Sequence, residues 1–237
     1  ASAIASGNGG EVIFWADEAT QFYGNISARG GLMLGDGGFV EVSGKESLLY
    51  QGVVDVSSVL GESGTLLLDP ENIVIFNGAG QPNDGDLSAD SEIFFGDAPV
   101  GGTSNISEDI LENTAGNIVL EATNNIEIQD LLDGELTLTP GGSIRFAADN
   151  QFSMVDRSDV IVTSGSDITI IADSIQAGNI LADGPAGIVP GDIFLNTPTA
   201  SGGDIEVGAL RSIFINNDPT ITSDGGAISV ISDGNIT

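Results

Sequence analysis

The chain has 237 residues, of which 41% are hydrophobic, so it can bury a substantial core and is not expected to be disordered. Its 35 acidic and five basic residues give a formal net charge of -30, which excludes nucleic-acid binding through basic clusters and disfavours anionic lipid surfaces. Cysteine and histidine are both absent, which excludes disulfides, thiolate metal sites and Ser–His or Cys–His catalysis. No apolar run approaches the ~20 residues that cross a bilayer, so membrane insertion is not expected.

A short phrase recurs along the chain: a small residue, any residue, and then an apolar, a variable and an apolar residue. Most copies begin roughly 25 residues after the previous one, which is the range of solenoid repeats. The nine clear copies are 10–14, 38–42, 64–68, 91–95, 116–120, 142–146, 166–170, 191–195 and 226–230, with two further copies at 203–207 and 211–215. Some units contain a second run in which apolar residues alternate with other residues, for example 125–128 and 134–138.

Apolar residues two positions apart lie on the same face of a β-strand, so each phrase predicts a short strand with one buried face. Such strands form a core only when successive units stack, with Val40, Leu66, Ile93 and Ile118 in one column. The sequence therefore predicts an all-β fold, a right-handed parallel β-helix of about nine coils that forms one domain over residues 1–237. Two alternative folds fit the sequence less well. An antiparallel sandwich would not need a repeat near 25 residues, and a propeller blade needs about 40 residues.

The repeat is interrupted by an excursion at about 77–113. Residues 77–90 are rich in Gly, Asn and Asp, which is typical of a loop. A short helix is predicted near 107–113, with Ser107 as its N-cap and acidic residues in its first turn. Ile110 and Leu111 are expected to cover the end or side of the solenoid.

Several longer motifs resemble a known family. The stretch from Gly37 to Ile75 contains GGFVEVSGKESL, GVVDVSS and GTLLLDPENIVI. It is preceded by GNGGEVIFWADEATQFYGNISARGG and followed by ISEDILENTAGNIVLEATNNIEIQD. Over roughly residues 7–130 the chain resembles the filamentous-haemagglutinin-like exoproteins of two-partner secretion systems, in particular the haemagglutinin-repeat proteins of cyanobacteria and related diderm bacteria.

This resemblance implies a β-helical protein that is exported through an outer-membrane transporter barrel and then displayed at the cell surface or released. Members of the family act in adhesion, aggregation and matrix formation. The Asn-Pro-Asn-type signature of the family's N-terminal secretion domain is absent here. The resemblance therefore implies the body region that follows that domain, with an extracellular location.

Two groups of acidic residues are candidate sites. Asp84, Asp86 and Asp90 lie in the predicted loop and offer the hard oxygen ligands that calcium prefers, although their spacing does not match an EF-hand. No other cofactor is expected. Asp residues are also common in turns because they tolerate left-handed backbone, so these side chains have an equally simple structural explanation.

A second group could form the carboxylate patch that polysaccharide lyases and hydrolases use. It comprises Asp149, Asp156 and Asp159, near Arg145 and Arg157 in the sequence. We favour the interpretation that these are solvated turn residues around a strand, and therefore expect no enzyme activity.

Four aromatic residues cluster near the start of the chain: Phe14, Trp15, Phe22 and Tyr23. Phe14 is at a position of the repeat whose side chain is expected to point into the core, whereas the side chain of Trp15 is expected to point outward. Trp15 and Tyr23 form a possible contact surface, for a sugar or for a neighbouring domain. Asn124 and Asn125 are expected to start a ladder of stacked amides inside a turn.

The leading functional hypothesis is a structural and adhesive extracellular rod. The chain begins and ends inside the repeat, which indicates a fragment of a longer assembly or a unit that assembles head-to-tail or laterally with itself. Cell-surface glycans are possible further partners. The alternatives are a carbohydrate-binding or polysaccharide-degrading β-helix and a calcium-stabilised module resembling a β-roll.

Overall fold

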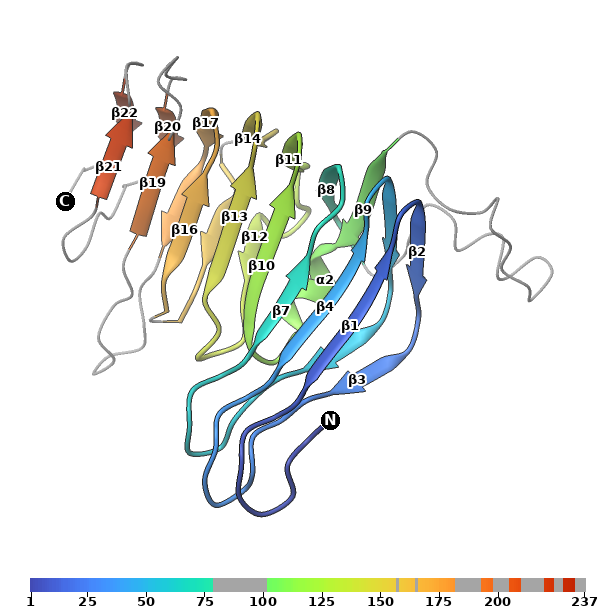
Figure 1. The fold of residues 1–237 in the computed structure, drawn as a ribbon. Coiled ribbons are helices and arrows are strands. Elements are labelled where there is room, and N and C mark those ends of the chain that lie inside the picture. Colours follow the sequence, from blue (N-terminus) through green and yellow to red (C-terminus); the bar gives the residue numbers. More distant parts are fainter. Residues whose placement is uncertain are drawn as a thin grey trace.

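A computed structural model describes residues 1–78, 102–156, 158–164, 166–181, 193–197, 205–209, 220–223 and 228–232. In these ranges the chain forms short parallel strands stacked into a β-solenoid, with very little helix (Figure 1). Within the same ranges, no helix has the length and apolar character needed to traverse a lipid bilayer.

The first sheet runs along one side of the solenoid and has eight strands in the described ranges. In spatial order, they are β1 (Glu11–Ala16), β4 (Phe39–Gly44), β7 (Thr65–Leu68), β10 (Asn117–Ala122), β13 (Ile144–Ala148), β16 (Ile168–Ile171), β19 (Ile193–Thr197) and β21 (Thr220–Ser223). Every neighbouring pair in this sheet is parallel. Parallel pairing between strands one repeat apart rules out the antiparallel sandwich.

The second sheet has nine strands in the described ranges. In spatial order, they are β2 (Ala19–Phe22), β5 (Ser47–Tyr50), β9 (Thr103–Ser107), β8 (Asn72–Phe76), β11 (Asn125–Ile128), β14 (Gln151–Met154), β17 (Ser174–Ala177), β20 (Ile205–Ala209) and β22 (Ile228–Ser232). Two smaller parallel sheets are β12 (Glu135–Thr137), β15 (Val160–Val162) and β18 (Asn179–Leu181), and β3 (Asn25–Ser27) with β6 (Val53–Asp55).

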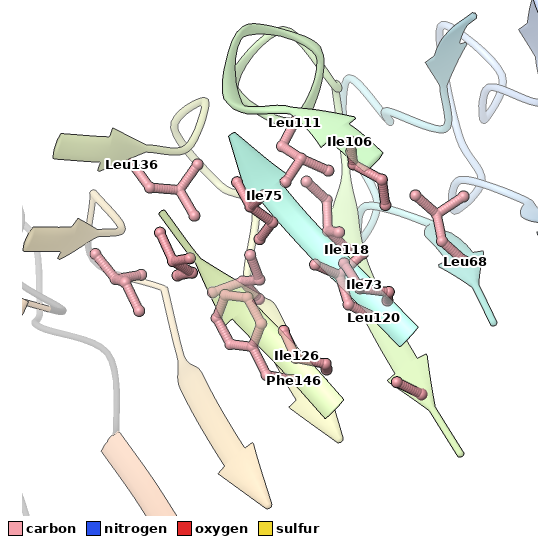
Figure 2. Close-up of a cluster of buried hydrophobic side chains, with 14 of the residues drawn as sticks. Leu68, Ile73, Ile75, Ile106, Leu111, Ile118, Leu120, Ile126, Leu136 and Phe146 are labelled. Carbon is pink, nitrogen blue, oxygen red and sulfur yellow. The ribbon is translucent and has the colours of Figure 1, made fainter. Parts of the chain in front are cut away.

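The core consists of columns of inward-facing apolar side chains, one from each stacked coil. In the first sheet, Val40 pairs with Leu66, Leu66 with Ile118, and Ile118 with Ile144. All four side chains are buried, whereas the residues that alternate with them are more exposed. Figure 2 shows side chains of both main sheets meeting in this core. The predicted parallel solenoid with one buried face per strand is therefore confirmed.

Two details of the predicted stacking are wrong. Leu66 was expected to be followed in its column by Ile93, but its partner is Ile118; Ile93 itself lies outside the described residues. Ile228 belongs to the second sheet, where it pairs with Ile205. The count of about nine coils is also slightly off, since the first sheet has eight strands in the described ranges and β9 is an additional strand within one coil.

Strand β9 is inserted out of sequence order. It follows β8 in the chain but lies between β5 and β8 in space. The second sheet therefore gains one strand width, ~4.8 Å, that the first sheet lacks at this level. Correspondingly, β4 pairs with β1 over six residues but with β7 over only three, from Phe39 to Glu41. The insertion forces the coils on either side of it apart along one face.

The short helix α2 (Glu108–Glu112) follows β9, as predicted, and Ser107 is its N-cap residue. The Ser107 hydroxyl does not bond to the helix but donates to the carbonyl of Gly78. The Glu112 carboxylate accepts a hydrogen bond from the backbone N–H of Thr137 in β12, with a donor–acceptor distance of 2.7 Å. Leu111 is fully buried, so α2 closes part of the solenoid where a strand would otherwise stack.

The predicted amide ladder is present at the turn between the two main sheets. The Asn124 side-chain amide donates to Asn72 Oδ1 of the preceding coil at 2.9 Å. The Asn150 amide of the following coil donates to Asn125 Oδ1 at 2.8 Å. These bonds connect three coils at the same turn and satisfy polar groups that stacking removes from water.

Gly37 marks a turn where neighbouring coils approach closely. A Cβ atom at Gly37 would lie 1.8 Å from the Val56 carbonyl oxygen and 2.2 Å from the Gly64 nitrogen. Both obstacles are backbone atoms, which cannot move without separating the coils.

We therefore expect Gly37→Ala to destabilise the protein by about 2 kcal/mol, measured by urea unfolding. Gly24→Ala is the matched control, because the nearest atom to its added methyl group is a Phe22 ring carbon at 3.6 Å. Equal stability of the two variants would contradict the close stacking at Gly37.

Candidate functional site

A groove of about 490 Å³ is present on the surface of the solenoid. It lies at the corner where strands of the first sheet end and the chain turns into the second sheet. Its lining includes four carboxylates and one arginine, together with small or apolar side chains. The lining residues are Asp69, Glu121, Ala122, Thr123, Arg145, Ala147, Ala148, Asp149, Ile171 and Asp173.

The parallel register brings these residues together from four successive coils. Leu68 pairs with Leu120, so Asp69 and Glu121, which follow them, are neighbours. Glu121 in turn pairs with Ala147, and Ala147 pairs with Ile171. The groove therefore has two carboxylates at its start and a half-buried apolar floor further along the rod.

Asp149 and Asp173 belong to the same two coils as Ala147 and Ile171 and lie two residues after them, at the turn into the second sheet. Each follows a first-sheet strand, β13 or β16, by one or two residues. The backbone of the next residues continues the stack, because Ser174 N–H donates to the Asn150 carbonyl at 3.0 Å. Asp149 and Asp173 occupy the same turn in successive coils, so their carboxylates are neighbours along the rod.

Negative charge dominates the groove. Arg145 forms an ion pair with Glu121, with Nη1 and Oε1 2.7 Å apart. Among the described residues, no ion pair involves Asp69, Asp149 or Asp173. The pKa of Asp69 is raised, mainly because burial disfavours its charged form and also because Glu121, Glu41 and Asp149 repel it.

The carboxylate patch considered for Asp149, Asp156 and Asp159 does not form as a single site. Asp149 lies in the groove with Arg145, whereas Asp156 and Asp159 gather with Asp130 in a different cluster. These residues do not meet because strand β14 lies between Asp149 and Asp156 and carries the chain around the solenoid. The favoured interpretation, solvated turn residues, is wrong for Asp159, which is buried. Arg157 lies outside the described residues.

The Asp130–Asp156–Asp159 cluster places one oxygen from each carboxylate within 4.8 Å of the others. Its oxygens also accept hydrogen bonds from the local backbone. Asp159 Oδ2 accepts a hydrogen bond from Leu131 N–H at 2.9 Å, and Asp156 Oδ1 accepts one from Ser158 N–H at 2.8 Å. Burial raises the pKa of Asp159, whereas the bonds from Ser158 lower the pKa of Asp156. The geometry could hold a cation, and the observed bonds already give two of the carboxylates a structural role.

The proposed aromatic contact surface lies at the first coil. Trp15 is 54% exposed on β1, and Tyr23, just after β2, is 36% exposed. Phe14 was expected in the core but is 47% exposed, because β1 has a described strand partner, β4, on one side only. Its ring still packs on Phe22, with the centroids 6.0 Å apart.

The loop residues Asp84, Asp86 and Asp90 lie outside the described residues, so the calcium hypothesis at this loop remains a prediction. Sequence reasoning missed Asp130, and it missed Asp69, Glu121 and Asp173 as companions of Asp149. A signal was available: Asp130 and Asp156 are one repeat length apart, as are Asp149 and Asp173. Residues one repeat apart are stacked neighbours in a solenoid.

The chain matches no known protein-family model and no curated protein.

Proposed function

We propose that the protein is a structural and adhesive rod rather than an enzyme. The observation that carries this proposal is the stacked architecture itself: two long parallel sheets enclose one continuous apolar core. Each coil buries its apolar face against its neighbours, so the repeat builds length rather than an enclosed pocket. A stiff rod of this kind can hold several contact points at fixed spacing.

We further propose that this rod is the body of a secreted surface protein or filament of the filamentous-haemagglutinin-like class. The motif resemblance over residues 7–130 supports this, and a parallel solenoid is compatible with it. On this proposal the chain passes through an outer-membrane transporter barrel and acts outside the cell. The high negative charge suits a soluble extracellular surface.

The proposal includes self-association as the main interaction, with surface glycans as possible further partners. Strand β1 supports self-association, because Ile13 and Trp15 are both 54% exposed on it. Exposed apolar residues on a strand with one described partner favour pairing with another chain. The proposal includes no resident cofactor.

Electron microscopy of the purified protein, combined with antibody labelling of intact cells, tests this proposal. We expect label at the cell surface and elongated particles at least ~40 Å long, from eight coils of ~4.8 Å each, that persist in the presence of a metal chelator. Compact particles, exclusively internal label, collapse on chelation or turnover of a polysaccharide substrate would each contradict part of it.

A further inference from the structure

We propose that two copies of this chain associate side by side through an apolar ridge on the first three coils. The ridge is carried by the turns that precede β1, β4 and β7, which lie next to one another (Figure 1). This inference extends the self-association in the proposed function to a second surface, separate from the strand β1. The ridge comprises six exposed side chains: Ile4, Leu32, Met33, Leu34, Val59 and Leu60.

Backbone hydrogen bonds hold the three turns together. The Gly7 N–H of the first turn donates to the Leu34 carbonyl of the second at 2.8 Å. The Gly30 N–H of the second turn donates to the Ser57 carbonyl of the third at 3.1 Å. Each step between turns is about one strand spacing, ~4.8 Å, so the six side chains share one continuous surface.

Glycines let these turns pack backbone against backbone. A Cβ atom at Gly31 would lie 2.7 Å from Ser6 Cα in the neighbouring turn. A Cβ atom at Gly35 would lie 2.0 Å from the Gly7 carbonyl oxygen, and one at Gly61 would lie 2.4 Å from the Gly35 carbonyl oxygen. No space remains between the turns for the apolar side chains, so they stay in solvent. A surface fixed in this way loses little conformational entropy when it binds.

The charge distribution favours a second copy of the chain as the partner. The stretches 1–10, 30–35 and 56–61 contain no charged side chain, whereas the whole chain has a formal net charge of -30. Two copies repel each other where acidic surfaces meet, and this repulsion is smallest where both present uncharged turns. A two-fold contact uses the same patch on both copies, so the ridge supplies both halves of the interface.

The exposed area is sufficient for a reversible dimer. The six side chains are 54% to 86% exposed. Together they present on the order of 500 Å² of apolar surface, which is at the upper end for a single patch on a monomer. With the flanking backbone of the turns, the ridge approaches the ~600 Å² per partner at which small specific interfaces begin.

Sedimentation equilibrium at about 0.15 M salt tests the proposal. We expect the unaltered protein to form a dimer with a Kd on the order of 10–100 μM. The double variant Leu32→Glu/Met33→Glu should dimerise at least about tenfold more weakly, because the contact would remove two carboxylates from water. Circular dichroism establishes that each variant remains folded. An unaltered protein that stays monomeric at about 1 mM would overturn the proposal.

The matched control adds the same two charges elsewhere. Leu132→Glu/Val155→Glu replaces apolar side chains that are 90% and 60% exposed and lie outside the ridge. This variant should dimerise as the unaltered protein does. Equal weakening in both double variants would overturn the proposal in favour of general charge repulsion.

A third double variant separates the ridge from the strand β1. Ile13→Ser/Trp15→Ser removes two exposed apolar side chains of β1 and should leave the ridge dimer intact. Association that is lost in this variant but kept in the ridge variant would overturn the ridge dimer, while the rod function and its contact at β1 would stand. Compact particles in electron microscopy would instead contradict the rod, whatever the dimer affinity.

Two further measurements identify the occupant of the ridge. Dimerisation should strengthen between about 0.05 and 0.5 M salt, because salt screens the repulsion between the two acidic chains. Weakening by salt would contradict an apolar contact. Flotation of the monomer with neutral phosphatidylcholine vesicles, lost in Leu32→Glu/Met33→Glu, would assign the ridge to a lipid surface and overturn the dimer.

Discussion

Leu120→Ala is expected to destabilise the protein by about 4 kcal/mol, because Leu120 is fully buried in the middle of the stack. It pairs with Leu68 on one side and with Phe146 on the other, so its removal leaves a cavity between three coils. Cross-strand hydrogen bonds hold these coils at fixed spacing, which limits collapse into the cavity. Equilibrium urea unfolding followed by circular dichroism measures the effect.

Leu132→Ala is the matched control, since it makes the same chemical change at a leucine that is 90% exposed. Its effect should stay within about 0.5 kcal/mol. Similar losses for the two leucines would be incompatible with the inward column that contains Leu120.

The protein is expected to be more stable in mild acid than at neutral pH. Burial is the main reason that the pKa values of Asp69, Glu108, Glu112 and Asp159 are raised in the folded protein. A carboxyl group whose pKa rises on folding stabilises the folded state when protonated. This stabilisation is complete below the ordinary pKa of about 4 and is lost as the pH rises through the raised folded value.

Mutual repulsion within a chain of formal charge -30 also makes the folded protein more stable in mild acid, because protonation reduces this repulsion. We therefore expect the melting temperature to be roughly 5 °C higher near pH 5 than at pH 8, measured by differential scanning calorimetry. The depressed pKa of Asp156 acts in the opposite direction, but it is one group against four.

Glu112→Gln separates the effect of one carboxyl group with a raised pKa from the effect of charge repulsion across the whole chain. The glutamine carbonyl can still accept the hydrogen bond from Thr137 N–H, while the partly buried negative charge is removed. The variant should gain stability at pH 8 and show a smaller pH dependence than the unaltered protein. A melting temperature that falls steadily from pH 8 to pH 5 would contradict the predicted sign.

The fold was largely predictable from the sequence because the repeat period and the alternation of apolar residues both express the stacking. Val40, Leu66 and Ile118 lie in one column as their spacing predicted, and the amide ladder at Asn124 follows from the same period. The error in the partner of Leu66 has a physical cause. The local pattern shows that a phrase can form a strand with one buried face, but it does not determine which phrases pair, and Leu66 pairs directly with Ile118 two repeats later.

The sites were less predictable, because they depend on which face each turn presents. Asp149 and Asp156 are close in sequence, yet β14 separates them and carries the chain around the solenoid. Alternation indicates which side chains point outward but not how far a turn rotates the following strand. The grouping of Asp130 with Asp159 therefore required the three-dimensional path of the chain.

The insertion of β9 also constrains the order in which the protein can fold. In a chain that winds from its N-terminus, β8 becomes available before β9, yet β9 must occupy the place between β5 and β8. Winding cannot simply add one coil after another at this point, because β8 has no final position until residues 103–107 arrive. Long-range pairing of this kind slows folding. We therefore expect a kinetic pause after the first two coils, with the later coils forming rapidly once β9 is in place.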